Sequence, residues 1–141
     1  MSALLEVKGL RVDIPLEAGI LHAVRGVDIV VERGKTLALV GESGCGKSLS
    51  VLSVMDLLPQ KAKWSADKIF FDGKNLNDAE PSPMANIRGS KIAMIFQEPM
   101  TSLNPCYTIG NQLEEALLTH KQVSRKDARD RAVFLLEKVG I

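Results

Sequence analysis

One octapeptide, GESGCGKS, carries the strongest chemical signal in the sequence. It fits the pattern G-x-x-x-x-G-K-[ST], which is typical of a loop that cradles phosphate groups. Gly41, Gly44 and Gly46 allow backbone angles that a Cβ would block, so that successive N–H groups can point inward and form an anion nest. Lys47 can reach the β- and γ-phosphates as a point charge, and the Ser48 hydroxyl can ligate Mg²⁺. The sequence therefore predicts a nucleotide-binding site.

The segments on both sides of this loop have the patterns of regular elements. Thr36–Val40 is apolar throughout and ends at the first glycine, which is typical of a strand buried on both faces. A helix that stops before Pro59 is predicted by the apolar positions Leu49, Val51, Leu52, Val54, Met55 and Leu58. The positive end of that helix would add to phosphate binding. The alternative interpretation is a glycine-rich turn that binds no ligand. Such a turn requires neither the buried strand before it nor the helix after it.

Further strands are predicted on both sides of this region. Leu4–Ile14 and Ala23–Val31 have the pattern of half-buried strands, and Pro15 and Gly19 mark a turn between them. Ile69–Phe71 predicts a short strand. The segment KIAMIF, residues 91–96, predicts a second strand of the buried type.

Two helices are predicted at the end of the sequence. The first covers Ile109–His120 and the second Ser124–Val139, where Ser124 and Asp127 form a capping-box pattern. A strand, a glycine loop and a helix in succession indicate an α/β fold with a parallel element.

Composition narrows the class of protein. The chain has 141 residues, of which 45% are hydrophobic and 25% charged, so we expect a globular protein and no disordered tail. The formal net charge of +1 gives no reason to expect a nucleic-acid partner. Two cysteines, Cys45 and Cys106, are too few for a disulfide framework, and no Cys/His cluster has metal-site spacing.

Cys45 lies inside the glycine loop, and two interpretations of it stay open. A thiol at a helix N-terminus can be activated as a nucleophile, which would make Cys45 a reactive or redox-sensitive site. Alternatively, Cys45 is a small residue that fits the loop and has no chemistry of its own. Maleimide labelling of Cys45 that ATP slows would favour the first interpretation.

Gln97 follows the apolar run 91–96 and begins a loop. From the end of a buried strand its amide could reach both the Mg²⁺ and the attacking water, and its position in a loop would let it move with the state of the nucleotide. The surrounding string FQEPMTSLNP, residues 96–105, resembles the Q-loop of ATP-binding subunits of ABC transporters, in the bacterial importer group for dipeptides and oligopeptides. GESGCGKS resembles the Walker A motif of the same group, and the resemblance covers Leu4 to Ile141.

This resemblance implies a P-loop NTPase fold of the ABC ATPase type, with an N-terminal antiparallel β-subdomain and the start of a helical subdomain. Residues 1–96 would form the β-subdomain and the phosphate-loop core, and residues 97–141 the Q-loop and the beginning of the helical subdomain. The resemblance also implies that the C-terminal half of such a domain is absent. We therefore expect the N-terminal portion of one ABC ATP-binding domain.

The resemblance also implies ATP and Mg²⁺ as cofactors and assigns their ligands. Mg²⁺ would be held by Ser48 and Gln97, and Gln97 would serve in catalysis. The phosphates would be held by Gly41, Ser43, Gly44, Cys45, Gly46, Lys47, Ser48 and Leu49. The implied partners are membrane-spanning permease subunits, which would contact Glu98–Pro105, and a second ATP-binding subunit. The protein would be peripheral, on the cytoplasmic face of the inner or plasma membrane.

The sequence departs from this family on the adenine side. The family stacks the base on an aromatic residue before the second strand, and the matching position here is Ile14. His22 is the other candidate, and the alternative interpretation is that His22 is an exposed turn residue. No Phe, Tyr or Trp residue precedes Trp64. Loss of such a stack would weaken binding by about 1–3 kcal/mol.

A second departure concerns hydrolysis. The sequence contains no LSGGQ signature, no apolar strand that ends in Asp-Glu, and no switch histidine. We therefore expect nucleotide binding without hydrolysis in a truncated product. Thr36–Val40 and the run 91–96 would then lack neighbouring strands, so we also expect marginal stability or aggregation. A stand-alone nucleotide-binding regulatory module is the alternative. A P-loop kinase is disfavoured because the sequence has no arginine-rich lid.

Overall fold

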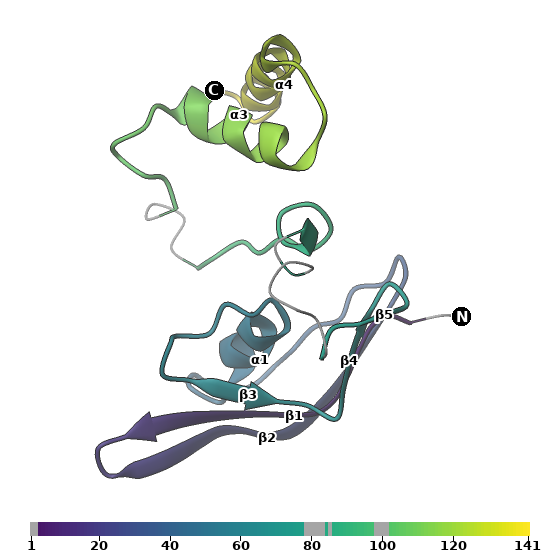
Figure 1. Ribbon diagram of the computed structural model, residues 1–141, viewed down its shortest axis with the longest axis vertical. Helices are drawn as coiled ribbons and strands as arrows, with labels where there is room; N and C mark the ends of the chain where they lie inside the picture. The colour runs from purple at the N-terminus through teal and green to yellow at the C-terminus, as the bar shows by residue number, and fades with distance from the viewer. Residues whose placement is uncertain (1–2, 78–83, 85, 98–101) are drawn as a thin grey trace. The chain divides into compact units, whose positions relative to one another are not determined.

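The computed structural model describes residues 3–77, 84, 86–97 and 102–141. The chain divides into two units, Met1–Ala85 and Asn86–Ile141, and each is considered by itself. The first unit is an antiparallel sheet with one helix packed against it, and the second contains a pair of helices (Figure 1).

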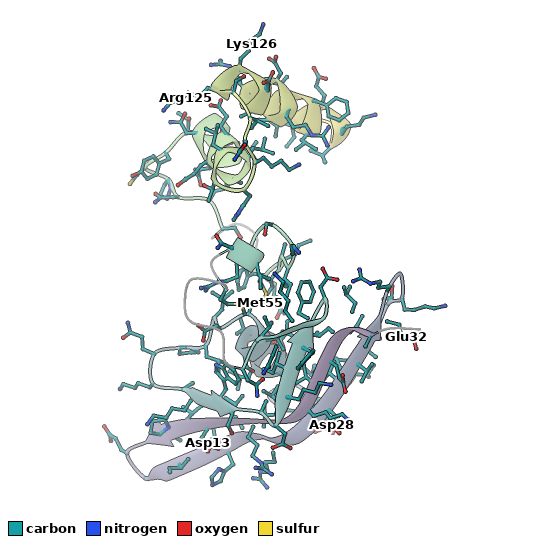
Figure 2. The ribbon with its side chains drawn as sticks, turned by 45° about the vertical axis from the view of Figure 1, so that its right-hand side comes forward. Asp13, Asp28, Glu32, Met55, Arg125 and Lys126 are labelled. Atoms are coloured by element: carbon teal, nitrogen blue, oxygen red, sulfur yellow. The ribbon has the colours of Figure 1, made fainter. Side chains whose placement is uncertain are left out.

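A long hairpin forms the base of the first unit. β1 (Ala3–Leu16) and β2 (Gly19–Glu32) pair antiparallel along most of their length. Figure 2 shows Asp13 on β1 and both Asp28 and Glu32 on β2. The fully buried side chains of β1 are Val7, Leu10 and Val12. Both strands and the intervening turn were predicted from the sequence, and the structure confirms them with longer bounds.

Three short strands complete the sheet. β4 (Lys68–Phe71) pairs with β1, and β5 (Lys74–Asn75) pairs with β4, which gives the order β2-β1-β4-β5. β3 (Lys63–Ser65) pairs with β1 nearer the hairpin turn. The predicted strand Ile69–Phe71 is confirmed by β4. β3 and β5 were not predicted because two or three residues are too short to show a period.

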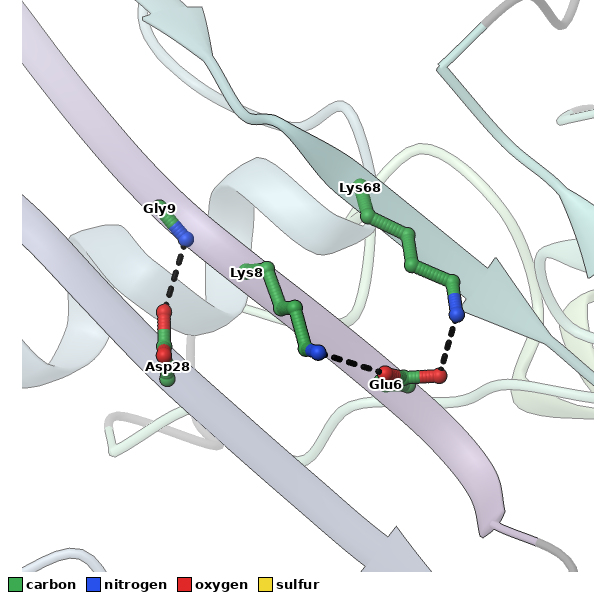
Figure 3. Close-up of polar contacts among 5 residues, drawn as sticks. All are labelled: Glu6, Lys8, Gly9, Asp28 and Lys68. Carbon is green, nitrogen blue, oxygen red and sulfur yellow. Dashed lines mark hydrogen bonds and ion pairs between the residues drawn. The ribbon is translucent and has the colours of Figure 1, made fainter.

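Two ion pairs and a backbone hydrogen bond involve residues of β1 (Figure 3). The Glu6 carboxylate lies 2.5 Å from Lys68 Nζ and 3.4 Å from Lys8 Nζ. The hydrogen bond from Lys68 lowers the pKa of Glu6 below its usual value of 4.5. Gly9 adopts φ +60°, and its N–H donates to Asp28 Oδ1 at 2.7 Å. The Lys68 contact joins β1 to β4, and the Gly9 hydrogen bond joins β1 to β2.

Helix α1 (Lys47–Val54) packs against β1 and β2. Its C-terminus is a Schellman motif, because the Asp56 N–H donates to Ser53 O at 3.1 Å and the Leu57 N–H donates to Leu52 O at 2.9 Å. Asp56 takes the left-handed conformation with φ +53°. The helix therefore ends at Val54, and the prediction that it continues to Leu58 is wrong.

Two predicted strands do not form. Thr36–Val40 and residues 91–96 are irregular, and Val40 is 93% exposed and Ile95 95% exposed. A buried strand requires neighbours that accept its backbone hydrogen bonds. Within the described ranges, no strand pairs with either run apart from an isolated parallel bridge between Arg88 and Ile92. The apolar pattern alone therefore did not decide the conformation.

The second unit contains α3 (Ile109–His120) and α4 (Arg125–Lys138), which pack against each other. The Asn111 N–H donates to Thr108 Oγ1 at the start of α3. At the start of α4, the Asp127 N–H donates to Ser124 Oγ at 3.1 Å, which confirms the predicted cap. Across the described residues, neither of these helices nor α1 has the length and apolar character needed to cross a bilayer.

Candidate functional site

The glycine loop leads directly into α1, as the sequence predicted. Gly44 has φ +79° and Gly46 has φ +94°, so both require the conformational freedom of glycine. Gly46 is also the N-cap of α1, and its carbonyl accepts the Ser50 N–H at 2.9 Å. The expectation that Gly41 needs an unusual backbone angle is wrong, because its φ is not positive. A Cβ on Gly41 would instead lie 2.7 Å from Cys45 Sγ.

Gly46 lies directly against the backbone of β2. A Cβ at this position would come within 2.8 Å of Ala23 O and 3.1 Å of Val24 Cγ2. Ala23 is an extra residue in β2, since Val12 pairs with Val24 while the next residue of β1 pairs with His22. A bulge of this kind bends a strand locally and is common beside functional sites. Sequence analysis missed Ala23 because an alanine inside a strand gives no signal.

Lys47 is folded back over the loop. Its ammonium group donates to Gly41 O at 2.7 Å and to Glu42 O at 2.6 Å, and it lies 3.4 Å from Cys45 Sγ. These three contacts match the three donors of an ammonium group. They hold the positive charge at the mouth of the loop, beside the N-terminus of α1. An anionic group at this position would gain both the charge of Lys47 and the helix dipole.

A pocket of about 670 Å³ opens between the loop and β2. Its lining includes Gly44 to Lys47 from the loop, Leu49 and Ser50 from α1, and side chains of β2. Ser50 Oγ donates to Gly46 O at 3.0 Å, which fixes the first turn of the helix. The pocket combines a cationic end at Lys47 with a largely apolar wall, and its volume is in the usual range for small-molecule sites.

Ser43 and Ser48 are both exposed, Ser43 within the loop and Ser48 in the first turn of α1. The Ser48 hydroxyl is a hard oxygen ligand of the type that Mg²⁺ prefers, and its exposed position leaves it accessible to a cation bound with phosphate. The site therefore fits a magnesium ion that is held jointly by Ser48 and a ligand. Among the described residues, no cluster of three or more His, Cys, Asp or Glu side chains could hold a metal alone.

The two candidates for contact with a base lie near the hairpin turn. His22 lines the pocket, but its Nδ1–H donates to Asp13 Oδ1 at 2.7 Å. Asp13 follows the buried Val12 in β1, so its side chain lies on the opposite face of the strand. The hydrogen bond therefore holds the imidazole against Asp13. Ile14 returns to the face of Val12 and pairs with Leu21, which lines the pocket.

Gln97 and the segment after it belong to the second unit. Gln97 is exposed at the end of the irregular run 91–96. The predicted contact segment Glu98–Pro105 lies partly outside the described residues, which resume at Ser102. Its last part is fixed by Gln112, a residue that sequence analysis missed. The Gln112 side chain donates to Asn104 O and Tyr107 O at 3.0 and 3.1 Å and accepts the Asn104 N–H at 2.9 Å.

The geometry defines a class of protein: a phosphate-binding glycine loop that leads into a helix packed on an antiparallel sheet. The same fold occurs in dimeric structures of the ATP-binding cassette MJ0796. One of these, a post-hydrolysis state bound to ADP and Pi, superposes with a TM-score of 0.78 at 23% identity over 94% of this chain and 56% of that chain. A second structure of the same cassette gives a TM-score of 0.77.

The chain belongs to the ABC transporter family, whose family model matches residues 24–141. It is 47% identical over its full length to the dipeptide transport ATP-binding protein DppD of Bacillus subtilis, of which it covers 42%. It is 44% identical to the oligopeptide transport ATP-binding protein OppD of the same organism, of which it covers 40%. A putative peptide import ATP-binding protein of Brucella melitensis is 49% identical over 98% of the chain. The chain thus spans about two fifths of the length of these relatives.

Proposed function

We propose that this chain provides the phosphate-binding part of an ATP-binding subunit that energises import of dipeptides or oligopeptides. The observation that carries the proposal is the position of Lys47. Its ammonium group lies at the mouth of a glycine loop, at the N-terminus of α1 and at one end of a 670 Å³ pocket. The peptide substrate class rests on the similarity to dipeptide and oligopeptide transport proteins.

In this proposal each residue of the loop has a defined task. The backbone N–H groups of Gly44 to Leu49 bind the phosphates of ATP, and Lys47 exchanges its contacts with loop carbonyls for contacts with phosphate oxygens. Ser48 binds Mg²⁺ together with the phosphates, and Gln97 supplies a further ligand. When bound, the metal neutralises phosphate charge. Gly41, Ser43 and Cys45 shape the loop around the nucleotide.

The proposed partners follow from the same family. Glu98–Pro105 would contact permease subunits in the membrane, and a second ATP-binding subunit would complete the assembly. The protein would then lie at the cytoplasmic face of the membrane as a peripheral subunit. The hydrogen bonds of the Gln112 side chain support the permease contact. They fix the backbone of Asn104 and Tyr107 and so limit the conformational entropy lost on docking.

Equilibrium binding of ATP, measured by isothermal titration calorimetry, tests the proposal. Lys47→Ala should weaken binding about 10- to 100-fold, because charge-assisted hydrogen bonds to phosphate are lost. Lys35→Ala is the matched control, since it removes the same charge from an exposed turn residue. If both substitutions weakened ATP binding equally, the loss of affinity would be due to net charge alone, which would contradict the proposed site.

A further inference from the structure

The extra residue of β2, Ala23, lies directly against the start of α1. Its carbonyl oxygen and the Val24 side chain both approach Gly46, at 2.8 and 3.1 Å from the position that a Cβ on Gly46 would take. Gly46 is the N-cap of α1 and lines the pocket next to Lys47. The conformation of the bulge at Ala23 therefore decides how the glycine loop can lie against β2.

The backbone ladder holds this part of β2 only weakly. Neither Ala23 nor Gly26, which has φ +90°, has a partner in the register with β1. Between these two positions only Val24 and Arg25 are paired. β2 also lies at the end of the strand order, so it pairs on one side only. Because the ladder is disrupted around an unpaired residue, side-chain contacts influence the backbone more here than in a regular strand.

Two side-chain hydrogen bonds meet at His22, the residue before the extra Ala23. The imidazole of His22 is hydrogen-bonded to Asp13 Oδ1 of β1 at 2.7 Å. The carbonyl oxygen of His22 accepts a hydrogen bond from Arg25 Nε at 3.2 Å. This second bond spans the extra residue and joins the two ends of the bulge. It therefore opposes any change of the bulge that would move the Ala23 carbonyl relative to Gly46.

Arg25 differs from Arg11, the residue directly opposite it in the hairpin. Both arginines are exposed, and both lie on the face away from the buried pair Val12 and Val24. Among the described residues, Arg11 has no polar partner and does not line the pocket. Arg25 lines the pocket and has further N–H donors that no described residue accepts. Direct contact with a nucleotide is therefore the role that competes with a bond across the bulge.

We propose that Arg25 is a positioning residue for the phosphate loop. By its bond to the His22 carbonyl, Arg25 keeps the bulge in the conformation in which Ala23 supports Gly46. The loop N–H groups and Lys47 thereby stay arranged for phosphate. Arg25 acts through the backbone in this role and does not touch the nucleotide. The inference rests on the proposed function, since its consequence is measured as phosphate binding.

Binding of ATP and of inorganic triphosphate, measured by isothermal titration calorimetry, tests this role. Arg25→Met should weaken binding of both ligands by the same factor, about three- to tenfold, because the loop binds both. Arg11→Met is the matched control, since it removes the same charge from the opposite position, and it should change neither affinity more than about twofold. A loss for ATP alone would assign Arg25 to the base or ribose and overturn the inference. No loss, or equal losses in the two variants, would also overturn it.

Rescue by a conservative variant is the second measurement. The ammonium group of Arg25→Lys can still donate to the His22 carbonyl. Both ligands should therefore bind to this variant within about twofold of their affinity for the unaltered protein. A loss in Arg25→Lys as large as that in Arg25→Met would show that the bond across the bulge does not support the loop.

The ligand-free protein separates positioning from direct contact with phosphate. If Arg25 acts through the bulge, Arg25→Met should shift the NMR amide signals of Gly46 and Lys47 in the absence of any ligand, whereas Arg11→Met should leave them unchanged. Unchanged loop signals in ligand-free Arg25→Met would overturn the inference and leave the proposed function intact. Failure of the unaltered protein to bind either ligand in a manner that depends on Lys47 would overturn both.

Discussion

The carbonyl oxygen of Ala23 lies only 2.8 Å from the position that a Cβ on Gly46 would take. This contact joins the bulge of β2 to the residue that starts α1. The phosphate loop is therefore positioned from two sides, by the helix that follows it and by the strand beneath it.

Gly46→Ala should consequently destabilise the fold more than Gly44→Ala does. Both substitutions place a Cβ on a left-handed residue, which costs about 1–2 kcal/mol. At Gly44 nothing lies within 4 Å of the new Cβ, whereas at Gly46 the backbone of Ala23 must move. We expect Gly46→Ala to lower the free energy of unfolding by about 2–5 kcal/mol in urea titrations. Equal losses for the two variants would show that the contact with Ala23 contributes nothing.

The Glu6–Lys68 pair predicts a dependence of stability on pH. The hydrogen bond from Lys68 holds the pKa of Glu6 below 4.5 in the folded protein. A depressed carboxyl pKa stabilises the fold above the unfolded value, and this contribution is lost as the pH falls through the folded pKa. Lys68→Met should therefore lower the urea midpoint more at neutral pH than at about pH 3. Lys61→Met, at an exposed position, is the control for charge removal. A Lys68→Met effect of the same size at both pH values would contradict this role.

Gln112 should control the order of the segment before α3. Gln112→Ala removes the acceptor of the Asn104 N–H and two donors to carbonyls of the same segment. We expect the Asn104 amide to exchange its hydrogen about two- to tenfold faster, as measured by NMR. Gln122→Ala changes the same side chain in the exposed connection between α3 and α4 and should leave this rate unchanged. An unaltered exchange rate of the Asn104 amide in Gln112→Ala would show that Gln112 does not order this segment.

Local signals predicted the parts of the structure that local interactions determine. The cap at Ser124 and the period of β1 and β2 depend on residues close in sequence or on one buried face, and these predictions are confirmed. The runs Thr36–Val40 and 91–96 depend on partner strands, which a pattern within the run cannot reveal. The expected tendency to aggregate stays a prediction, and the exposure of Val40 and Ile95 supports it.

The candidate site likewise contains residues that local sequence signals predicted and residues that such signals could not predict. The octapeptide identified Lys47 and the helix that follows, because phosphate binding imposes residue types at fixed spacing. It could not identify Ala23, since alanine is an ordinary strand residue whose importance here arises from the register of β2 against the loop. The direction of the His22 side chain likewise depends on Asp13 across the hairpin.

We predict that the 141-residue polypeptide binds nucleotide without hydrolysing it, because its sequence has no LSGGQ signature and no apolar strand that ends in Asp-Glu. Attack of water on a phosphoryl group requires a side chain that orients or polarises the water. Among the described residues that line the pocket, none is Asp, Glu or Gln. Phosphate release from ATP and Mg²⁺ should therefore equal the release measured for Lys47→Ala purified in the same way. Release that exceeds this control and rises in proportion to protein concentration would contradict the prediction, because it would require a catalytic group supplied from outside the described pocket.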